Sequence, residues 1–131
     1  MQPVEMLRVF PRENGSVAAE FGLVLPLILL LTIGGIGLGS MMFAGVSLHY
    51  ATEDAARCAS VKTTVCPDQT ALTTYATAKY KGPTLASMTF TLTAAASGTC
   101  GNQVVGAGTY QLRTGMGTVS VPMSATACYP A

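Results

Sequence analysis

The sequence predicts an α+β protein in which a long amino-terminal transmembrane α-helix precedes a small disulfide-linked domain with one helix and a short antiparallel β-sheet. Three observations lead to this prediction. No residue between Glu20 and His49 carries a formal charge. All four cysteines follow that uncharged run. The last third of the chain contains segments in which apolar and polar residues alternate, as they do in half-buried strands.

The uncharged run predicts a single membrane-spanning helix. As a helix its roughly 28 residues would be about 42 Å long, whereas a bilayer core requires about 20 residues. A lone span must satisfy its own backbone hydrogen bonds in lipid, which only a helix allows. We therefore expect a long hydrophobic helix over residues 16–61, with its transmembrane part at about residues 21–48.

The remaining residues, 62–131, predict a small extracytoplasmic α+β domain. A second helix is expected over residues 67–81, because Pro67 and Asp68 favour a helix start and Gly82-Pro83 favours an end. Strict alternation predicts a strand at 88–94 and two more runs near 110–112 and 119–125, while 98–108 is rich in turn residues. Pro122 cannot donate to a ladder, so the last strand should be an edge strand or carry a bulge. On the second helix we expect the buried face to consist of Leu72, Tyr75, Ala76 and Tyr80. On the first helix we expect the domain to pack on the small residues Ala51, Ala55, Cys58 and Ala59.

The cysteines favour disulfides over a metal site. The four of them allow three pairings, of which we favour Cys58–Cys66, joining the helix end to the next loop, and Cys100–Cys128, joining a turn to the last strand. Zinc is the competing interpretation, but there is no C-x-x-C motif and His49 is the only histidine. Because paired cysteines imply an oxidising compartment, the carboxyl-terminal domain should face outward.

Composition argues against several classes of function. A formal net charge of +1 gives no electrostatic case for a nucleic-acid partner. Beyond Asp54 the chain has one carboxylate, Asp68, and no histidine, so no acid–base pair can be assembled there. We expect no enzyme activity, no cofactor and no metal.

The junction at the start of the apolar run resembles a known family. Gly15, four small residues, Glu20 and Phe21 precede the hydrophobic stretch, an arrangement similar to the processing site of type IV-like prepilins. The continuation from Glu20 to Leu27 resembles the TadE-like family of tight-adherence (Flp-like) pilus proteins. Later segments are also similar, namely Ala55 to Ala59, Cys100 to Gln103 and Ala127 to Pro130.

This resemblance implies a pilin-like minor pilin, or pseudopilin. A membrane-embedded prepilin peptidase would cut between Gly15 and Ser16, which makes residues 1–15 a leader. The other partners implied are pilin and minor pilin subunits, the pilus assembly platform and membrane lipid. The location implied is the bacterial inner membrane, with the domain in the periplasm, and a surface pilus after assembly.

Several of these positions have a second interpretation. Gly15 could instead mark a helix boundary capped by Asn14 or Ser16. Glu20 could pair with the amino group freed at Ser16, or it could sit solvated at headgroup depth beside the positive end of the helix dipole. Gly35 and Gly39 have the small-xxx-small spacing of packed membrane helices, although glycine is common in such helices.

Two further residues, Phe21 and Pro26, belong to the candidate assembly region. Pro26 removes a helix hydrogen bond and should bend or loosen the span, and Phe21 is the first residue of the apolar run.

The alternative function is a single-pass, membrane-anchored binding module that presents its domain to a ligand.

Overall fold

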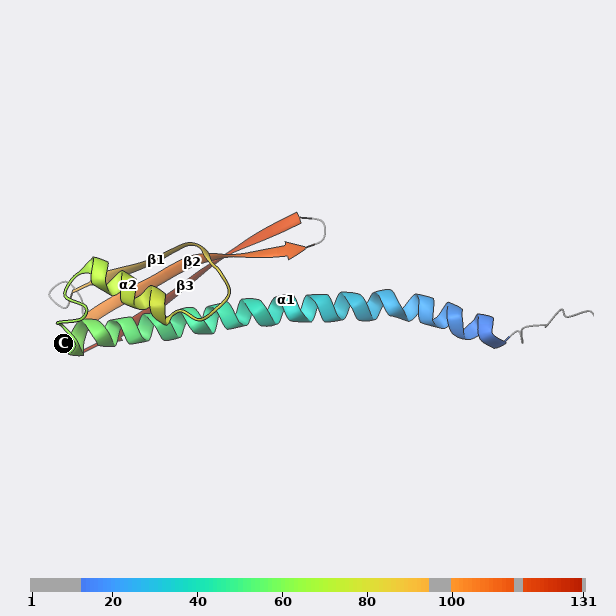
Figure 1. Ribbon diagram of the computed structural model, residues 1–131, viewed down its shortest axis with the longest axis horizontal. Helices are drawn as coiled ribbons and strands as arrows, with labels where there is room; N and C mark the ends of the chain where they lie inside the picture. Colours follow the sequence, from blue (N-terminus) through green and yellow to red (C-terminus); the bar gives the residue numbers. More distant parts are fainter. Residues whose placement is uncertain (1–12, 95–99, 115–116, 131) are drawn as a thin grey trace, which may run out of the picture. The chain divides into compact units, whose positions relative to one another are not determined.

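The computed structural model describes residues 13–94, 100–114 and 117–130 (Figure 1). Its elements are α1 (Glu13–Val61), α2 (Gln69–Lys79), β1 (Ala86–Thr93), β2 (Asn102–Thr114) and β3 (Gly117–Tyr129). The chain divides into two compact units, Met1–Ile36 and Gly37–Ala131, and α1 contributes to both. The predicted α+β fold class is confirmed. Most of the predicted leader, residues 1–12, lies outside the described residues.

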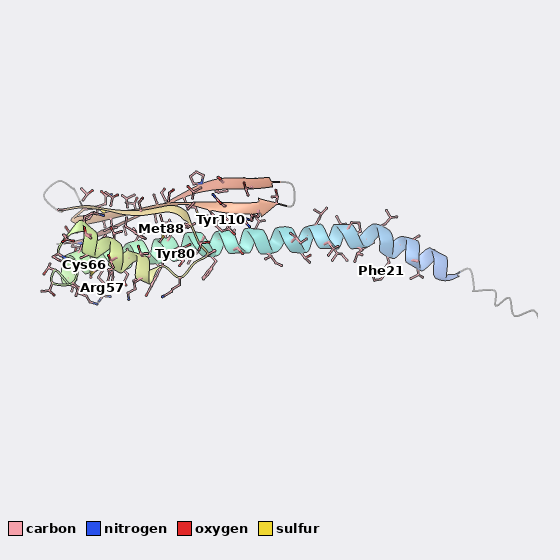
Figure 2. The ribbon with its side chains drawn as sticks, turned by 45° about the horizontal axis from the view of Figure 1, so that its top comes forward. Phe21, Arg57, Cys66, Tyr80, Met88 and Tyr110 are labelled. Carbon is pink, nitrogen blue, oxygen red and sulfur yellow. A yellow bond between two sulfur atoms is a disulfide. The ribbon has the colours of Figure 1, made fainter. Side chains whose placement is uncertain are left out.

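In the second unit, α1 supplies the surface on which the small domain packs. Buried residues recur at helical spacing along one side of it: Ala44, Ser47, Leu48, Ala51, Thr52, Ala55, Ala56, Cys58 and Ala59. The predicted stripe of small residues is therefore the buried face of the helix. Met88, Tyr80 and Tyr110 gather along this part of α1 (Figure 2); Met88 and Tyr80 pack against the core cluster, and Tyr110 is 9% exposed.

Helix α2 is two residues shorter at each end than the predicted range. Asp68 has an extended backbone, and its carboxylate accepts a hydrogen bond from the Ala71 N–H at 2.8 Å, so Asp68 is the N-cap and Pro67 precedes the helix. At the other end, Tyr80 turns extended and the Lys81 N–H donates to Ser47 Oγ at 2.9 Å. The buried face is as predicted, with Leu72 and Ala76 fully buried and Tyr75 and Tyr80 packed against the core.

The sheet is antiparallel with the strand order β1-β2-β3. Strand β1 corresponds to the predicted strand at 88–94, and it carries a bulge between Ala86 and Thr89. Strand β3 lies at the sheet edge, where Pro122 pairs with Thr109, as the missing N–H of proline requires.

The prediction of a turn-rich segment at 98–108 is wrong for residues 102–108, which belong to β2. Residues 98 and 99 lie outside the described residues. A Cβ at Gly106 would collide with Thr52 Oγ1 on α1 and would come within 3.0 Å of Phe90 Cε1. A Cβ at Gly108 would come within 3.0 Å of Leu85 Cδ1. These glycines therefore mark close contacts across the sheet face and not turns.

The outer edge of β1 is closed by a side chain. The Gln69 amide donates from Nε2 to the Phe90 carbonyl and accepts from the Leu92 N–H at 2.7 Å. The Gln69 side chain thus makes two hydrogen bonds to β1 of the kind that a neighbouring strand would make. These bonds also hold α2 beside the sheet.

The two disulfides join Cys58 to Cys66 and Cys100 to Cys128, the pairing that we favoured from the sequence. The first connects the end of α1 to the loop before α2. The second connects the chain before β2 to the end of β3. Both therefore close the domain at the end where α1 finishes.

We predict that Gly106→Ala destabilises the domain by about 1–3 kcal/mol, because the added methyl group must displace Thr52 or Phe90. The measurement is denaturant unfolding of the full chain in detergent micelles, followed by tyrosine near-ultraviolet circular dichroism. Gly45→Ala is the matched control, since a Cβ at Gly45 has nothing within 4 Å and alanine favours a helix. Equal unfolding midpoints for both variants would contradict the close packing of β2 on α1.

Candidate anchoring and assembly site

The first unit presents an apolar helix surface that the described part of the chain leaves uncovered. Its large hydrophobic side chains between Val17 and Ile36 are all exposed, from 48% at Leu25 to 79% at Leu23. Among the described residues, α1 is the one helix that is long and apolar enough to cross a membrane, judged by length and composition. A long apolar amino-terminal helix of this kind suggests a membrane anchor.

The predicted cleavage junction lies within the first turns of α1. The helix begins at Glu13, so the Gly15–Ser16 bond is part of it, and both residues are exposed. Glu20 is also exposed and follows Ser16 by four residues, which puts the two on one face of the helix. No ion pair to Glu20 occurs within the described residues, so its carboxylate is available to a partner outside them.

Phe21 and Pro26 occupy the same exposed stretch. Phe21 projects from the helix and is 67% exposed (Figure 2). Pro26 lies inside α1 and has no N–H to donate to the carbonyl of Gly22. Further along, the Thr32 hydroxyl is satisfied locally, because it donates to the Ile28 carbonyl at 2.9 Å and lies 3.0 Å from that of Leu29. The span can therefore hold this polar side chain in an apolar environment.

In the described chain, no residue packs where the side chains of Gly35 and Gly39 would lie. Both are exposed, and a Cβ built on either has nothing within 4 Å. Because they are four residues apart on a helix, they form one smooth strip that a second helix could approach closely. The structure therefore leaves the small-xxx-small surface open to a partner.

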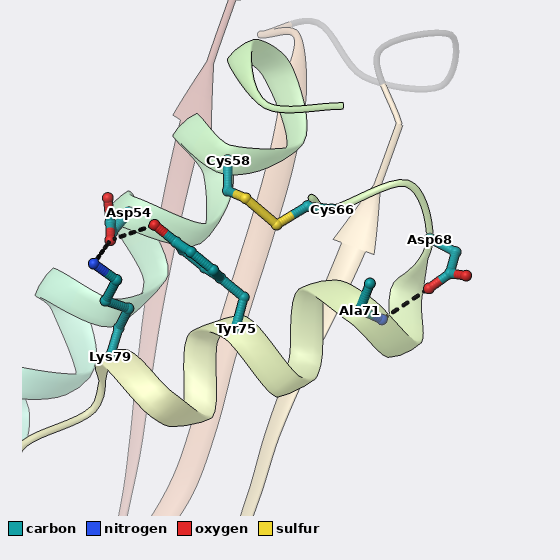
Figure 3. The surroundings of a disulfide bond; sticks show 7 residues. All are labelled: Asp54, Cys58, Cys66, Asp68, Ala71, Tyr75 and Lys79. Carbon is teal, nitrogen blue, oxygen red and sulfur yellow. Dashed lines mark hydrogen bonds and ion pairs between the residues drawn. A yellow bond between two sulfur atoms is a disulfide. The ribbon is translucent and has the colours of Figure 1, made fainter. Parts of the chain in front are cut away.

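A polar cluster that the sequence did not reveal holds α2 against α1 (Figure 3). Asp54 Oδ2 accepts a hydrogen bond from the Tyr75 hydroxyl at 3.0 Å and lies 3.2 Å from Lys79 Nζ. Lys79 Nζ also lies 5.3 Å from the centre of the Tyr75 ring. The hydrogen bond and charge of Asp54 raise the pKa of Lys79 above its usual 10.5. The sequence indicates only that Tyr75 and Lys79, at i, i+4 spacing, lie on one face of a helix. It does not indicate that Asp54 is their partner.

The described residues contain no group of three histidine, cysteine, aspartate or glutamate side chains that could hold a metal ion. All four cysteines are in disulfides. His49 is exposed on α1, near the end of the uncharged run.

We predict that Asp54→Asn returns the pKa of Lys79 toward 10.5, because the neutral amide removes the charge that stabilises the ammonium group. Since the folded pKa is raised, the stabilising contribution of the pair is fully present below about pH 10.5 and is lost as the pH rises through the folded pKa. The measurement is NMR titration of the lysine side-chain resonances. Asp68→Asn removes another carboxylate next to α2 and should leave the Lys79 pKa unchanged; an equal effect of both variants would contradict the pairing.

The family model described as TadE-like protein matches residues 15–57 of the chain. The match covers the Gly15 junction, the whole exposed span and most of the helix face on which the domain packs. No curated protein and no solved structure matches the chain. The resemblance inferred from the sequence is thereby confirmed over this region, and it suggests a part in the tight-adherence pilus.

Proposed function

We propose that this chain, TadE-like over residues 15–57, is a minor pilin (pseudopilin) of a tight-adherence pilus. In this proposal prepilin peptidase removes residues 1–15, and α1 anchors the mature chain in the inner membrane with its domain in the periplasm. The helix then leaves the lipid and packs among other pilin subunits, in the pilus or in its assembly platform, so that the domain contributes to a surface used in adhesion.

The observation that carries the proposal is the bare apolar surface of α1. Burying apolar area stabilises by about 25 cal/mol per Å², so a row of large side chains from Val17 onward cannot remain in water. Lipid can cover this surface before assembly. Helices with a similar surface can cover it afterwards, without any change in the fold of the domain.

The Gly15–Glu20 junction favours a pilin over the alternative of a plain anchored binding module. A carboxylate at the start of a lipid-embedded helix is costly, and an anchor alone has no use for it. Cleavage after Gly15 would create an amino group at Ser16, four residues from Glu20 on the same helix face. This amino group, on the same chain or on a neighbouring one, is the opposite charge that would stabilise the Glu20 carboxylate in a low-dielectric setting.

The helix also offers a surface for a close neighbour. Gly35 and Gly39 have open space where a Cβ would lie, so a partner helix could approach the backbone of α1 there. Pro26 leaves a backbone carbonyl without its usual helical donor, which allows local adjustment of the helix during packing. Both features support assembly through α1.

The proposed processing predicts a mature protein that begins at Ser16. The measurement is amino-terminal sequencing and intact mass of the chain extracted from membranes of its native host. A mature chain that retains residues 1–15, or one cut after the apolar run, would contradict the pilin assignment and favour the anchored module.

For Glu20→Gln we expect normal insertion and cleavage but a loss of incorporation into pili, because the amide cannot pair with the new amino group. The assay compares processed protein in sheared surface fibres with processed protein left in the membrane. Glu53→Gln is the control, since Glu53 is an exposed glutamate on α1 outside the uncharged run. Incorporation of Glu20→Gln at the wild-type ratio would remove the charge pair from the assembly mechanism.

A further inference from the structure

The β2–β3 pair extends beyond the rest of the sheet as a two-stranded ribbon (Figure 1). Pairing of β1 with β2 ends at Ala86 and Thr109, whereas pairing of β2 with β3 continues to Thr114 and Gly117. We call residues 110–114 and 117–121 the ribbon. An isolated two-stranded ribbon is only marginally stable in water, so its neighbours matter.

The ribbon has one apolar and one polar face. Leu112 pairs with Val119 and Tyr110 with Val121, while the alternate pairs, Gln111 with Ser120 and Arg113 with Thr118, are polar. Arg113 is the one charged side chain in β2 and β3 as described, and it is exposed.

The apolar face of the ribbon meets α1 at Gly37. A Cβ at Gly37 would come within 3.0 Å of Leu112 Cδ1, so the missing side chain makes room for the leucine. Val119, directly across from Leu112, remains 52% exposed. Part of the apolar face is therefore uncovered beside this point of the helix.

The contact with Gly37 places Leu112 beside this residue of α1. A bilayer core requires about 20 residues of helix, and a span that starts after Glu20 would end at about Ser40. Gly37 would then lie within one helical turn of the boundary between acyl chains and headgroups, and so would Leu112 beside it. If lipid covered α1 as far as Leu48, the charge of Arg113 and the unpaired backbone edge of β3 would lie in hydrocarbon, where both are costly.

We propose that the ribbon is a second membrane contact, in which Leu112 and Val119 enter the acyl–headgroup boundary and Arg113 binds lipid phosphate. This proposal rests on the membrane anchoring within the proposed function. Three features of the ribbon fit a phospholipid surface: its contact with α1 at Gly37, the exposed apolar side chain of Val119 and the positive charge of Arg113. The ribbon would thereby hold α1 from about Met41 to Leu48 outside the hydrocarbon and orient the domain on the membrane.

The test uses tryptophan fluorescence, because the chain contains no tryptophan. The full chain carrying Val119→Trp is reconstituted in phosphatidylcholine–phosphatidylglycerol vesicles, with and without bromine on the upper acyl carbons. Val65→Trp is the matched negative control, since Val65 is 51% exposed beyond the far end of α1. Leu30→Trp, within the span, is the positive control for anchoring.

We expect brominated lipid to quench Val119→Trp several-fold more than Val65→Trp. Quenching of Leu30→Trp but not of Val119→Trp would overturn the ribbon contact, and failure to quench Leu30→Trp would overturn the anchoring itself. Equal quenching of Val119→Trp and Val65→Trp would mean that the whole domain lies on the membrane, against the proposal. Protection of Val119→Trp from aqueous acrylamide without quenching by bromine would assign the ribbon to a second chain.

The role of Arg113 has its own variant. In the Val119→Trp chain, Arg113→Glu should reduce quenching in vesicles that contain phosphatidylglycerol. Lys62→Glu makes the same charge reversal at an exposed site at the far end of α1 and should not. Equal quenching with Arg113→Glu and Lys62→Glu would remove lipid phosphate from the proposal. Thr118→Trp, at the same level on the polar face, provides an independent probe if Val119→Trp does not fold.

Discussion

The apolar surface of α1 is the constraint on which the rest of the structure depends. The domain covers one face of the helix from Gly37 onward, while the large apolar side chains from Val17 to Ile36 are at least 48% exposed. Such a surface is unfavourable in water and is stabilised when an apolar environment covers it. Lipid and packed helices are both apolar environments of this kind, so the proposed anchored and assembled forms can use the same segment.

The carboxyl-terminal half of α1 packs against the domain through small residues. Ala51, Ala55 and Ala59 let the domain approach the helix closely, and Gly106 brings β2 against Thr52. Packing of this kind buries little apolar area for each residue, so covalent and polar links carry more of the stability. The two disulfides each contribute about 2–4 kcal/mol by restricting the unfolded chain, and the Asp54–Tyr75–Lys79 cluster fixes α2.

Local signals made most of the fold predictable. The small-residue stripe and the alternation around Phe90 and Met123 indicate which side chains face the core, and the uncharged run indicates a long apolar helix. The ends of α2 could not be placed from the sequence, because one end depends on the Asp68 cap and the other on a hydrogen bond from Lys81 to Ser47. The role of Gln69 could not be predicted from the sequence, because its hydrogen bonds depend on which strand lies beside it in the fold.

The glycines show why part of the structure could not be predicted from the sequence. Gly106 resembles a turn residue in the sequence, because the residue that it faces, Thr52, lies on a helix some 54 residues earlier in the chain. Gly37 makes room for Leu112, yet in the sequence it looks the same as Gly35 and Gly39 on either side of it. The function of a glycine is set by what faces it, and only a structure can say that. Gly35 and Gly39, which face nothing in the described chain, therefore remain open to a partner helix, while Gly37 is already committed to the domain.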